Sequence, residues 1–275
     1  MEAQFAEYIA AHAELCRLAR IQAIKFPSYD PRAKKYFVTT NPGQAVPWDT
    51  NRTDTWDDNF GKTISAELAQ MFSHVQGKIA SLQFTDQGLD EYFSCMSKAS
   101  LILTLSNGTK IWQCSAEGAS QLGHNTPNVV RVCLESTPSI SGDFAHIDLD
   151  DGTPMMETPS MSYEQFCLFL ATLEKVFLSA QNRDQNIIVN CSQGQSRSGL
   201  FVVCLLMKLS MCDEFSPNME ARIPKEFLIK TSDWTQLLCS TYKFVNFRRV
   251  ITYVNPKFVP FLIFMAKKIH AANCK

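Results

Sequence analysis

The sequence lacks an excess of charge of either sign, because 26 Lys and Arg residues balance 27 Asp and Glu residues in a chain of 275. Such a chain has no global field that would attract nucleic acid or an anionic membrane surface. It also lacks any uninterrupted apolar run of about 18 residues, so no membrane-spanning helix is expected. Neither a nucleic-acid partner nor a membrane span is therefore expected, and any anion that the protein recognises must be held by a local site.

The ten cysteines are too few in 275 residues for a disulfide framework, and they lack the spacing of a metal site. They include no CxxC pair, and no His and Cys residues have zinc-finger spacing, so no metal and no cofactor are expected. The first 20 residues carry Glu2, Glu7 and Glu14 among apolar residues, which is unlike a signal peptide. We therefore expect a cytoplasmic protein with free and mostly buried thiols.

The composition favours a large globular core, since hydrophobic residues make up 45% of the chain. The length exceeds that of an average domain but suits one large α/β domain, so we expect a single domain over residues 1–275. An amphipathic helix is predicted over residues 1–24, as either an accessory or an integral element. Residues 26–62 are rich in Pro, Asn, Asp, Thr and Gly, which predicts loops with little regular structure before a helix at about 64–74.

Strands and helices alternate through the rest of the chain. The predicted strands span residues 100–105, 109–115, 127–135, 144–149 and 187–191. The predicted helices span residues 162–180, 199–212, 233–253 and 255–271. Asn107-Gly108 is expected to form a hairpin turn, and Ser160 or Ser162 to cap the first of these helices. This order predicts an α/β fold with a central mixed sheet flanked by helices.

The segment IIVNCSQGQSRSGLFVVCLL, residues 187–206, carries a candidate phosphate site. A short apolar strand ends at Cys191, a five-residue loop follows, and Arg197 opens an apolar helix. Small residues and glycine allow successive backbone N–H groups to point at an anion, and the helix N-terminus adds its dipole. The predicted substrate-binding residues are those of the loop, Ser192, Gln193, Gly194, Gln195 and Ser196.

The same segment contains the groups that phosphate-ester hydrolysis needs. Arg197 can donate two parallel hydrogen bonds to phosphate oxygens. Cys191 lies at the bottom of the positive nest, which favours the thiolate, and a thiolate can attack phosphorus to form a phosphocysteine. Ser198 can donate a hydrogen bond to the sulfur and ease its departure in the second step. The residues therefore predict a phosphate-monoester hydrolase with Cys191, Arg197 and Ser198 as catalytic groups.

The loop resembles the signature of the cysteine-dependent protein tyrosine phosphatase family, His-Cys-x-x-Gly-x-x-Arg-Ser/Thr-Gly. Residues 190–199 match this signature in all but the leading His, and segments 47–52 and 82–93 are similar to two further elements of the family. The resemblance covers about residues 30–271. It implies a protein tyrosine phosphatase-like fold and a phosphorylated protein as substrate, with phosphotyrosine as the first expectation.

The family takes the proton for the leaving oxygen from an Asp in a Trp-Pro-Asp-x-Gly-x-Pro loop. The segment DLDDGTP, residues 148–154, is similar, and aligning its Gly and Pro with the family places Asp150 at the acid position. Asp148 and Asp151 remain alternatives, because clustered carboxylates can raise the pKa of any one of them. A divalent-cation site is a weaker alternative, since no fourth ligand is in register.

The chain departs from the family at four places. Asn190 replaces the His before the nucleophile, and Pro42 stands where tyrosine-specific members have a Tyr that holds the substrate ring. The loop has Gln193 and Gln195 where relatives that act on inositol phosphates often place basic residues. The late Gln that positions water is missing. Its region, 248–264, offers Asn255, Lys257 and Phe258 instead.

These departures keep two alternatives open. One is the same chemistry on phosphoserine, phosphothreonine, a phosphoinositide or an RNA 5′-phosphate. The other is a phosphate-binding pseudophosphatase with little or no turnover. Elsewhere, the charged pairs Arg248-Arg249 and Lys267-Lys268 are expected to lie on solvated helix faces.

Overall fold

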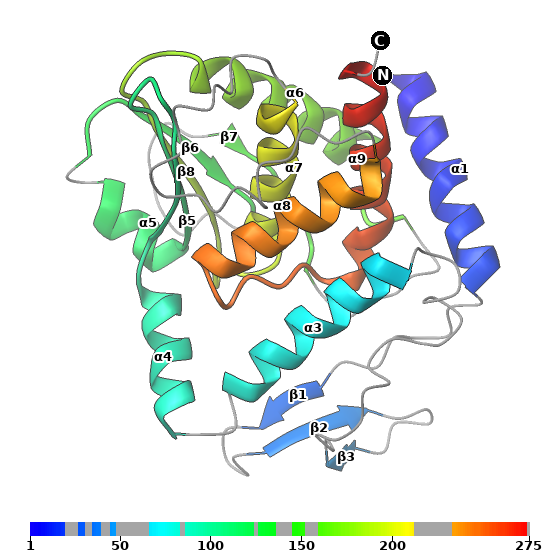
Figure 1. The fold of residues 1–275 in the computed structure, drawn as a ribbon, viewed down its shortest axis with the longest axis vertical. Helices are drawn as coiled ribbons and strands as arrows, with labels where there is room; N and C mark the ends of the chain where they lie inside the picture. The colour runs from blue at the N-terminus through cyan, green and yellow to red at the C-terminus, as the bar shows by residue number, and fades with distance from the viewer. Residues whose placement is uncertain are drawn as a thin grey trace.

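A computed structural model of the chain shows a central sheet with helices on both faces (Figure 1). It describes residues 1–19, 27–30, 35–39, 45–47, 66–82, 86–123, 126–135, 145–151, 159–211 and 233–273. The central sheet has the strand order β4-β5-β8-β6-β7. Its strands are β4 (Ser100–Thr104), β5 (Lys110–Ser115), β6 (Val129–Cys133), β7 (Ala145–His146) and β8 (Asn186–Cys191). Only the β4–β5 pair is antiparallel, so the predicted α/β fold with a mixed sheet is confirmed.

The hairpin between β4 and β5 forms at the predicted Asn107-Gly108 turn. Gly108 has a φ of 86°, a left-handed conformation that favours glycine. The side-chain amide of Asn107 donates to the backbone oxygens of Ala180 and Asn182, at 2.9 and 2.8 Å. The turn is thereby fastened to the loop that leads into β8, which fixes β5 beside β8.

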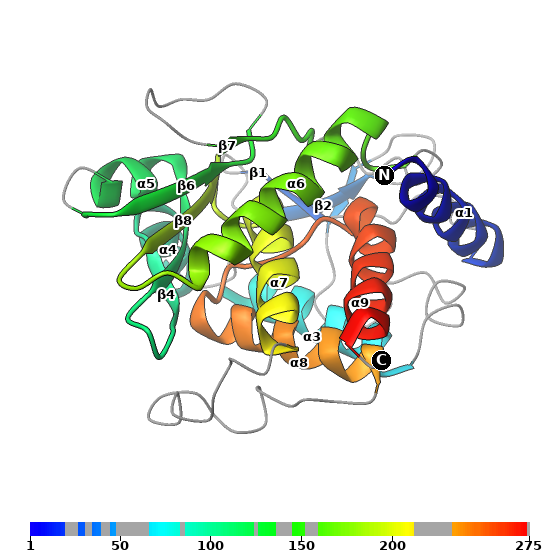
Figure 2. The same ribbon diagram turned by 90° about the horizontal axis from the view of Figure 1, so that it is seen from above.

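The helices that cover the two faces of the sheet are visible in Figure 2. One face is covered by α5 (Ala116–Gly123), with α4 (Asp86–Ser97) beside it. The other is covered by α6 (Tyr163–Ala180) and α7 (Arg197–Ser210). Helix α7 packs in turn against α8 (Trp234–Arg248) and α9 (Val259–Asn273), and a 3-10 turn, η3 (Pro256–Phe258), comes directly before α9. Helix α7 is thus surrounded by protein, as its apolar sequence predicts.

Helix α6 begins where its sequence predicts. Ser162 is the N-cap, because its side chain accepts a hydrogen bond from the backbone N–H of Gln165. The Gln165 side chain in turn accepts from the backbone N–H of Ser162, which completes a capping box. Of the two predicted caps, Ser162 is therefore correct. Glu164 lies in the first turn, where its charge complements the helix dipole.

The N-terminal helix α1 (Glu2–Ala19) packs into the main core. Tyr8 is completely buried, stacks on Phe166 with ring centroids 5.5 Å apart, and meets Phe261 edge-on at 5.4 Å. Its hydroxyl lies 2.9 Å from the hydroxyl of Ser160. Helix α1 thus packs against α6 and α9 in the core.

Several expected elements differ from those observed. Residues 26–62 are not all loop, since β1 (Pro27–Asp30), β2 (Lys35–Thr39) and β3 (Ala45–Pro47) form a second, antiparallel sheet. Tyr36, Phe37 and Val38 have high strand propensity. The many Pro and Asn residues around them nevertheless made the segment resemble a loop. Helix α3 (Ala66–Leu82) runs longer than predicted, and α4 and α5 were not predicted. Pro42 and residues 48–52 lie outside the described residues.

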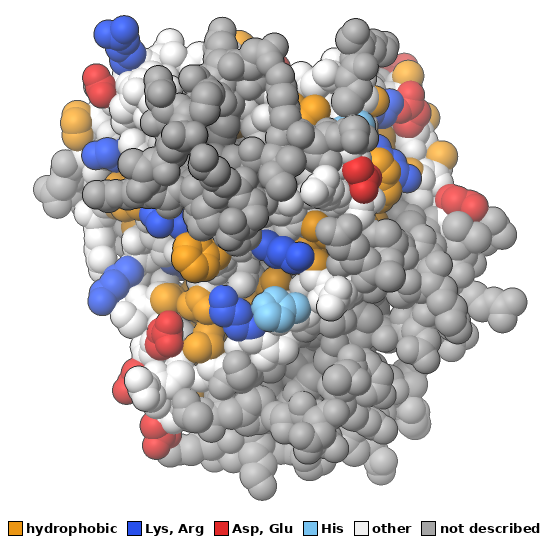
Figure 3. Space-filling model, viewed as in Figure 1, with side chains coloured by type: hydrophobic (Ala, Val, Ile, Leu, Met, Phe, Trp, Pro, Cys, Tyr) orange, Lys and Arg blue, Asp and Glu red, His pale blue; other side chains and the backbone are white. Residues whose placement is uncertain are grey.

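The surface of the described residues carries charges of both signs. On the face seen in Figure 3, Lys and Arg side chains lie together with Asp and Glu among apolar and neutral ones. Among the described helices, none combines the length and the apolar character that crossing a membrane requires.

Candidate active site

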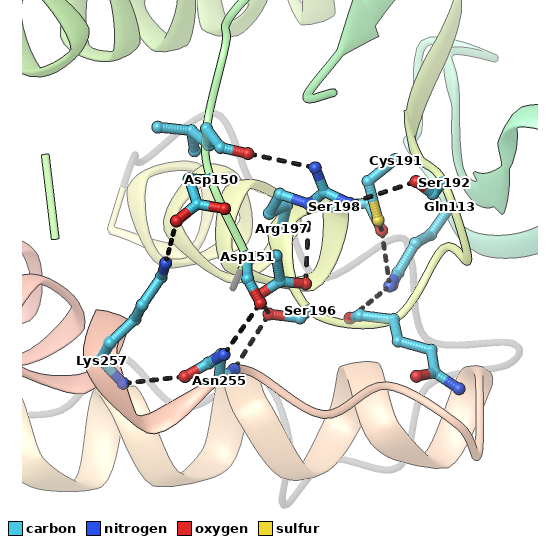
Figure 4. A network of polar contacts seen from close by, with 12 residues as sticks. Gln113, Asp150, Asp151, Cys191, Ser192, Ser196, Arg197, Ser198, Asn255 and Lys257 are labelled. Atoms are coloured by element: carbon cyan, nitrogen blue, oxygen red, sulfur yellow. Dashed lines mark hydrogen bonds and ion pairs between the residues drawn. The ribbon is translucent and has the colours of Figure 1, made fainter. Parts of the chain in front are cut away.

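The predicted strand–loop–helix forms a compact cradle at the carboxyl end of β8 (Figure 4). Cys191 is the last residue of β8 and is buried at the bottom of the loop. Ser192 and Gln193 are exposed, Gln195 is half-buried, and Gly194 and Ser196 are buried. Helix α7 begins at Arg197, two residues earlier than predicted, so Arg197 and Ser198 lie in its first turn.

Gly194 is required by the shape of the loop. Its φ of 68° is left-handed, and a Cβ atom there would lie 2.5 Å from the backbone nitrogen of Ser115 and 2.6 Å from Nη2 of Arg249. Real Cβ atoms do not approach backbone so closely. The loop therefore follows β5 at a separation that only glycine permits.

We expect Gly194→Ala to lower the free energy of unfolding by about 2 kcal/mol or more, because both the backbone conformation and the space are lost. Chemical denaturation measures this change. Gly77→Ala is the matched control, since Gly77 lies in α3 and a Cβ atom added there would have nothing within 4 Å. That variant should gain about 1 kcal/mol from helix propensity. Equal stability of Gly194→Ala and the wild type would contradict this reading of the loop.

Arg249 supports the loop through its buried side chain, contrary to the expectation from the sequence. It was expected on a solvated face, but it is 1% exposed. Its Nε donates to the backbone oxygen of Gly194 at 2.8 Å, and its Nη1 donates to the backbone oxygen of Lys98 at 3.0 Å. Burial lowers the pKa of Arg249. Arg248 also turns inward, donating to the backbone oxygen of Leu101 at 2.9 Å.

The Arg197 guanidinium joins the cradle to the segment that contains the candidate acids. Nη1 donates to the backbone oxygen of Leu149 at 3.1 Å, and Nη2 donates to the Ser192 hydroxyl at 3.2 Å. Nε lies 3.5 Å from Oδ2 of Asp151. These contacts fix the plane of the guanidinium at the loop, which is the preorganisation that a phosphate clamp needs.

The three candidate acids occupy different environments. The Asp150 side chain is 81% exposed, with Oδ2 3.3 Å from Nζ of Lys257. The Asp151 side chain is 25% exposed, and its Oδ1 accepts a hydrogen bond from the Ser196 hydroxyl at 2.8 Å. Asp148 is exposed, and its backbone oxygen accepts from Nε2 of Gln165 at 2.5 Å. The remaining residues of the predicted acid loop, 152–154, lie outside the described residues.

Burial raises the pKa of Asp151, although hydrogen bonding from Ser196 and the charges of Arg197 and Lys257 oppose the rise. The carboxyl of Asp151 thus touches the cradle, whereas that of Asp150 faces Lys257 (Figure 4). Of the three, Asp151 is the one observed to contact the loop through its side chain, so the assignment of Asp150 as the acid stays a prediction, with Asp148 and Asp151 as its alternatives.

Asn190, which stands where the tyrosine phosphatase signature has a His, contacts residues in and just after the neighbouring strand β6. It is completely buried. Its Nδ2 donates to Oε1 of Glu135 at 3.0 Å, and its Oδ1 accepts from Nε of Arg131 at 3.1 Å. The amide is therefore satisfied by side chains from β6 and the residues after it.

Asn255 and Lys257, in the region where the tyrosine phosphatase family has its late Gln, contact residues of the site. The backbone N–H of Asn255 donates to the Ser196 hydroxyl at 3.0 Å, and its Nδ2 donates to the backbone oxygen of Asp151 at 3.4 Å. Lys257 pairs with Asp150. Phe258 is buried, and Nζ of Lys257 lies 5.3 Å from the centre of its ring.

Gln113, on β5, is a second residue that the sequence reasoning missed. It is completely buried, and its Nε2 donates to the backbone oxygen of Gly194 at 3.0 Å and to the Ser198 hydroxyl at 3.3 Å. Ser198 Oγ in turn lies 3.4 Å from Sγ of Cys191. The available signal was an amide side chain between Trp112 and Cys114, in the middle of the strand KIWQCS.

No known protein-family model matches the sequence, and no curated protein matches it significantly. Across the described residues, no three His, Cys, Asp or Glu side chains gather as they would around a metal ion. Any function assigned to the chain therefore depends on the chemistry of the cradle around Cys191 and Arg197.

Proposed function

We propose that the protein hydrolyses phosphate monoesters on phosphorylated proteins, with phosphotyrosine as the expected residue, through a phosphocysteine on Cys191. We also propose that its α/β fold is protein tyrosine phosphatase-like. One observation carries the proposal: the Cys191 sulfur, the Arg197 guanidinium and the Ser198 hydroxyl, all on buried residues, converge at the loop between β8 and α7. A nucleophile, a phosphate clamp and a donor to the sulfur are the groups that this reaction requires.

In the first step, the Cys191 thiolate attacks phosphorus, a P–S bond forms, and the P–O bond to the leaving group breaks. The leaving oxygen takes a proton from Asp150, or from Asp151 if the alternative holds. Arg197 and the loop N–H groups stabilise the charge on the three phosphoryl oxygens. The products are the dephosphorylated alcohol or phenol and a phosphocysteine.

In the second step, water attacks phosphorus and the P–S bond breaks. The carboxylate that lost its proton now accepts one from the water, and inorganic phosphate forms. The thiolate leaves with a hydrogen bond from Ser198, whose Oγ lies 3.4 Å from the sulfur. Asn255 contacts the Ser196 hydroxyl and the backbone oxygen of Asp151, which places it between the loop and the candidate acids.

A substrate panel on the wild type and on Cys191→Ser tests the proposal. We expect the wild type to release phosphate from phosphotyrosine peptides, and Cys191→Ser to release none. The wild type could instead prefer phosphoserine or phosphothreonine peptides, phosphoinositide vesicles or RNA 5′-phosphates. Such a preference would change the proposed substrate class and leave the proposed phosphocysteine mechanism in place. Binding of inorganic phosphate with no hydrolysis of any substrate would favour the pseudophosphatase, which the exposed position of Asp150 keeps as the second candidate.

Alanine substitutions at the three carboxylates test which one is the acid. We expect Asp150→Ala to lower kcat on a small aryl phosphate by about 10²-fold, because loss of a general acid costs at least this much. Asp148→Ala is the matched control and should keep near wild-type turnover, since the observed contact of Asp148 with Gln165 uses only its backbone oxygen. A larger loss in Asp151→Ala than in Asp150→Ala would move the acid to Asp151.

A further inference from the structure

Gln113 lies beneath the cradle at the centre of a chain of buried polar side chains. Its Nε2 has two hydrogens and three acceptors within 3.5 Å, of which the nearest are the backbone oxygen of Gly194 at 3.0 Å and the Ser198 hydroxyl at 3.3 Å (Figure 4). Its Oε1 accepts a hydrogen bond from the Thr252 hydroxyl at 3.2 Å. All of these side chains are buried, so water does not compete for their hydrogen bonds.

The orientation of the Gln113 amide is fixed by its neighbours. The backbone oxygens of Gly194 and Gln195, at 3.0 and 3.5 Å from Nε2, can only accept hydrogen bonds. A flipped amide would bring Oε1 against these oxygens and leave no acceptor for the Thr252 proton. The amide nitrogen must therefore face Ser198, and toward Ser198 it can only donate.

This orientation decides where the Ser198 proton goes. A hydroxyl has one proton to donate, and Gln113 cannot receive it. The other observed contact of the Ser198 Oγ is the Cys191 sulfur at 3.4 Å, where a thiol can donate to the hydroxyl but a thiolate can only accept from it. Since Ser198 is completely buried, its proton is best satisfied by donating to the sulfur. A hydrogen bond donated to sulfur favours the thiolate over the thiol.

We propose that Gln113 is a positioning residue which, oriented by Thr252, directs the Ser198 proton to the Cys191 sulfur and so stabilises the thiolate. The effect on turnover rests on the proposed function, because a stabilised thiolate is both the nucleophile and the leaving group of that reaction. The effect on ionisation does not, since it concerns the resting protein alone.

The packing around Gly199 fits this chain of hydrogen bonds from Thr252 through Gln113 to Ser198, which we call the relay. Gly199 follows Ser198 in the first turn of α7 and has no left-handed φ. A Cβ atom there would lie 2.7 Å from Cγ2 of Thr252 and 3.5 Å from Nε2 of Gln113. The glycine therefore provides the space through which Thr252 and Gln113 approach the helix.

The experiment is a pH titration of the thiolate by its ultraviolet absorbance, taken as the difference between each protein and its Cys191→Ser counterpart. In Gln113→Met, which keeps the volume and removes the amide, the pH at half-signal should rise by about one unit. Thr252→Val should raise the pH at half-signal by a smaller amount. Thr252→Ser should leave it at the wild-type value, because this variant keeps the hydroxyl that donates to Gln113. Gln121→Met, at an exposed glutamine of α5, is the matched control and should not change it.

A double-mutant cycle separates the relay from a general structural effect. If Gln113 acts through Ser198, Gln113→Met should have no further effect on the titration in a Ser198→Ala background. An equal shift in both backgrounds, or no shift in the wild-type background, would overturn the proposal. Should Gln113→Met fail to fold, Thr252→Val with and without Ser198→Ala gives the same decision.

The relay and the proposed function can fail separately. A shifted titration in a protein that hydrolyses no phosphate ester would uphold the relay and reject the phosphatase. An unshifted titration in an active phosphatase would reject the relay and uphold the function.

Discussion

Cys191→Ser is expected to lower the hydrolysis of a small aryl phosphate by about four to six orders of magnitude, close to the background rate. Serine has nearly the same shape and can keep the contact with Ser198. Its hydroxyl, however, is not ionised near neutral pH. The loss therefore reports the missing thiolate rather than a damaged loop. Phosphate release or phenol absorbance measures it.

The control for this variant is Cys167→Ser. Cys167 is a half-buried thiol on α6, outside the cradle, so its substitution should leave turnover near that of the wild type. Cys191→Ser should still bind inorganic phosphate, because Arg197 and the loop N–H groups remain. Retained hydrolysis in Cys191→Ser, or an equal loss in Cys167→Ser, would refute Cys191 as the nucleophile.

The second large effect is expected at Arg197. We predict that Arg197→Lys lowers kcat/KM by about 10³-fold, the lower end of what an arginine that stabilises phosphoryl transfer contributes. Lysine keeps the charge but cannot contact Leu149, Ser192 and two phosphate oxygens from one plane. Steady-state kinetics on an aryl phosphate would measure the change.

Arg183→Lys provides the comparison for Arg197→Lys, because Arg183 is exposed in the loop before β8. It should keep wild-type kinetics. If Arg197→Lys also keeps them, the bidentate geometry has no catalytic role and the charge alone is sufficient. A loss confined to KM would assign Arg197 to substrate binding rather than to the transition state.

The parts of the site that are local in sequence could be predicted. Cys191 and Arg197 belong to one strand–loop–helix, and apolar periodicity alone indicates that arrangement. The cap at Ser162 and the turn at Asn107-Gly108 are also local, because each depends on residues within one turn of chain. The roles of these groups in catalysis remain predictions.

The supporting residues could not be predicted, because their partners are far away in the sequence. Gln113 bonds to Ser198 across 85 residues, and Arg249 bonds to Gly194 across 55. A charged or amide side chain in a strand or at a helix end does not reveal which backbone oxygen it will meet. The strands β1 to β3 were missed for a related reason, since strand pairing outweighed the local Pro and Asn content.

The most direct test of the central claim is capture of the phosphocysteine. Ser198→Ala should slow the second step, because the departing thiolate loses its hydrogen bond, so the intermediate should accumulate during turnover. Acid quenching and trypsin digestion would then yield the peptide of residues 184–197, which contains Cys191 as its only cysteine. We predict that mass spectrometry finds one phosphoryl group on Cys191. Phenol release with this peptide unmodified throughout, or a phosphoryl group on another residue, would contradict the account.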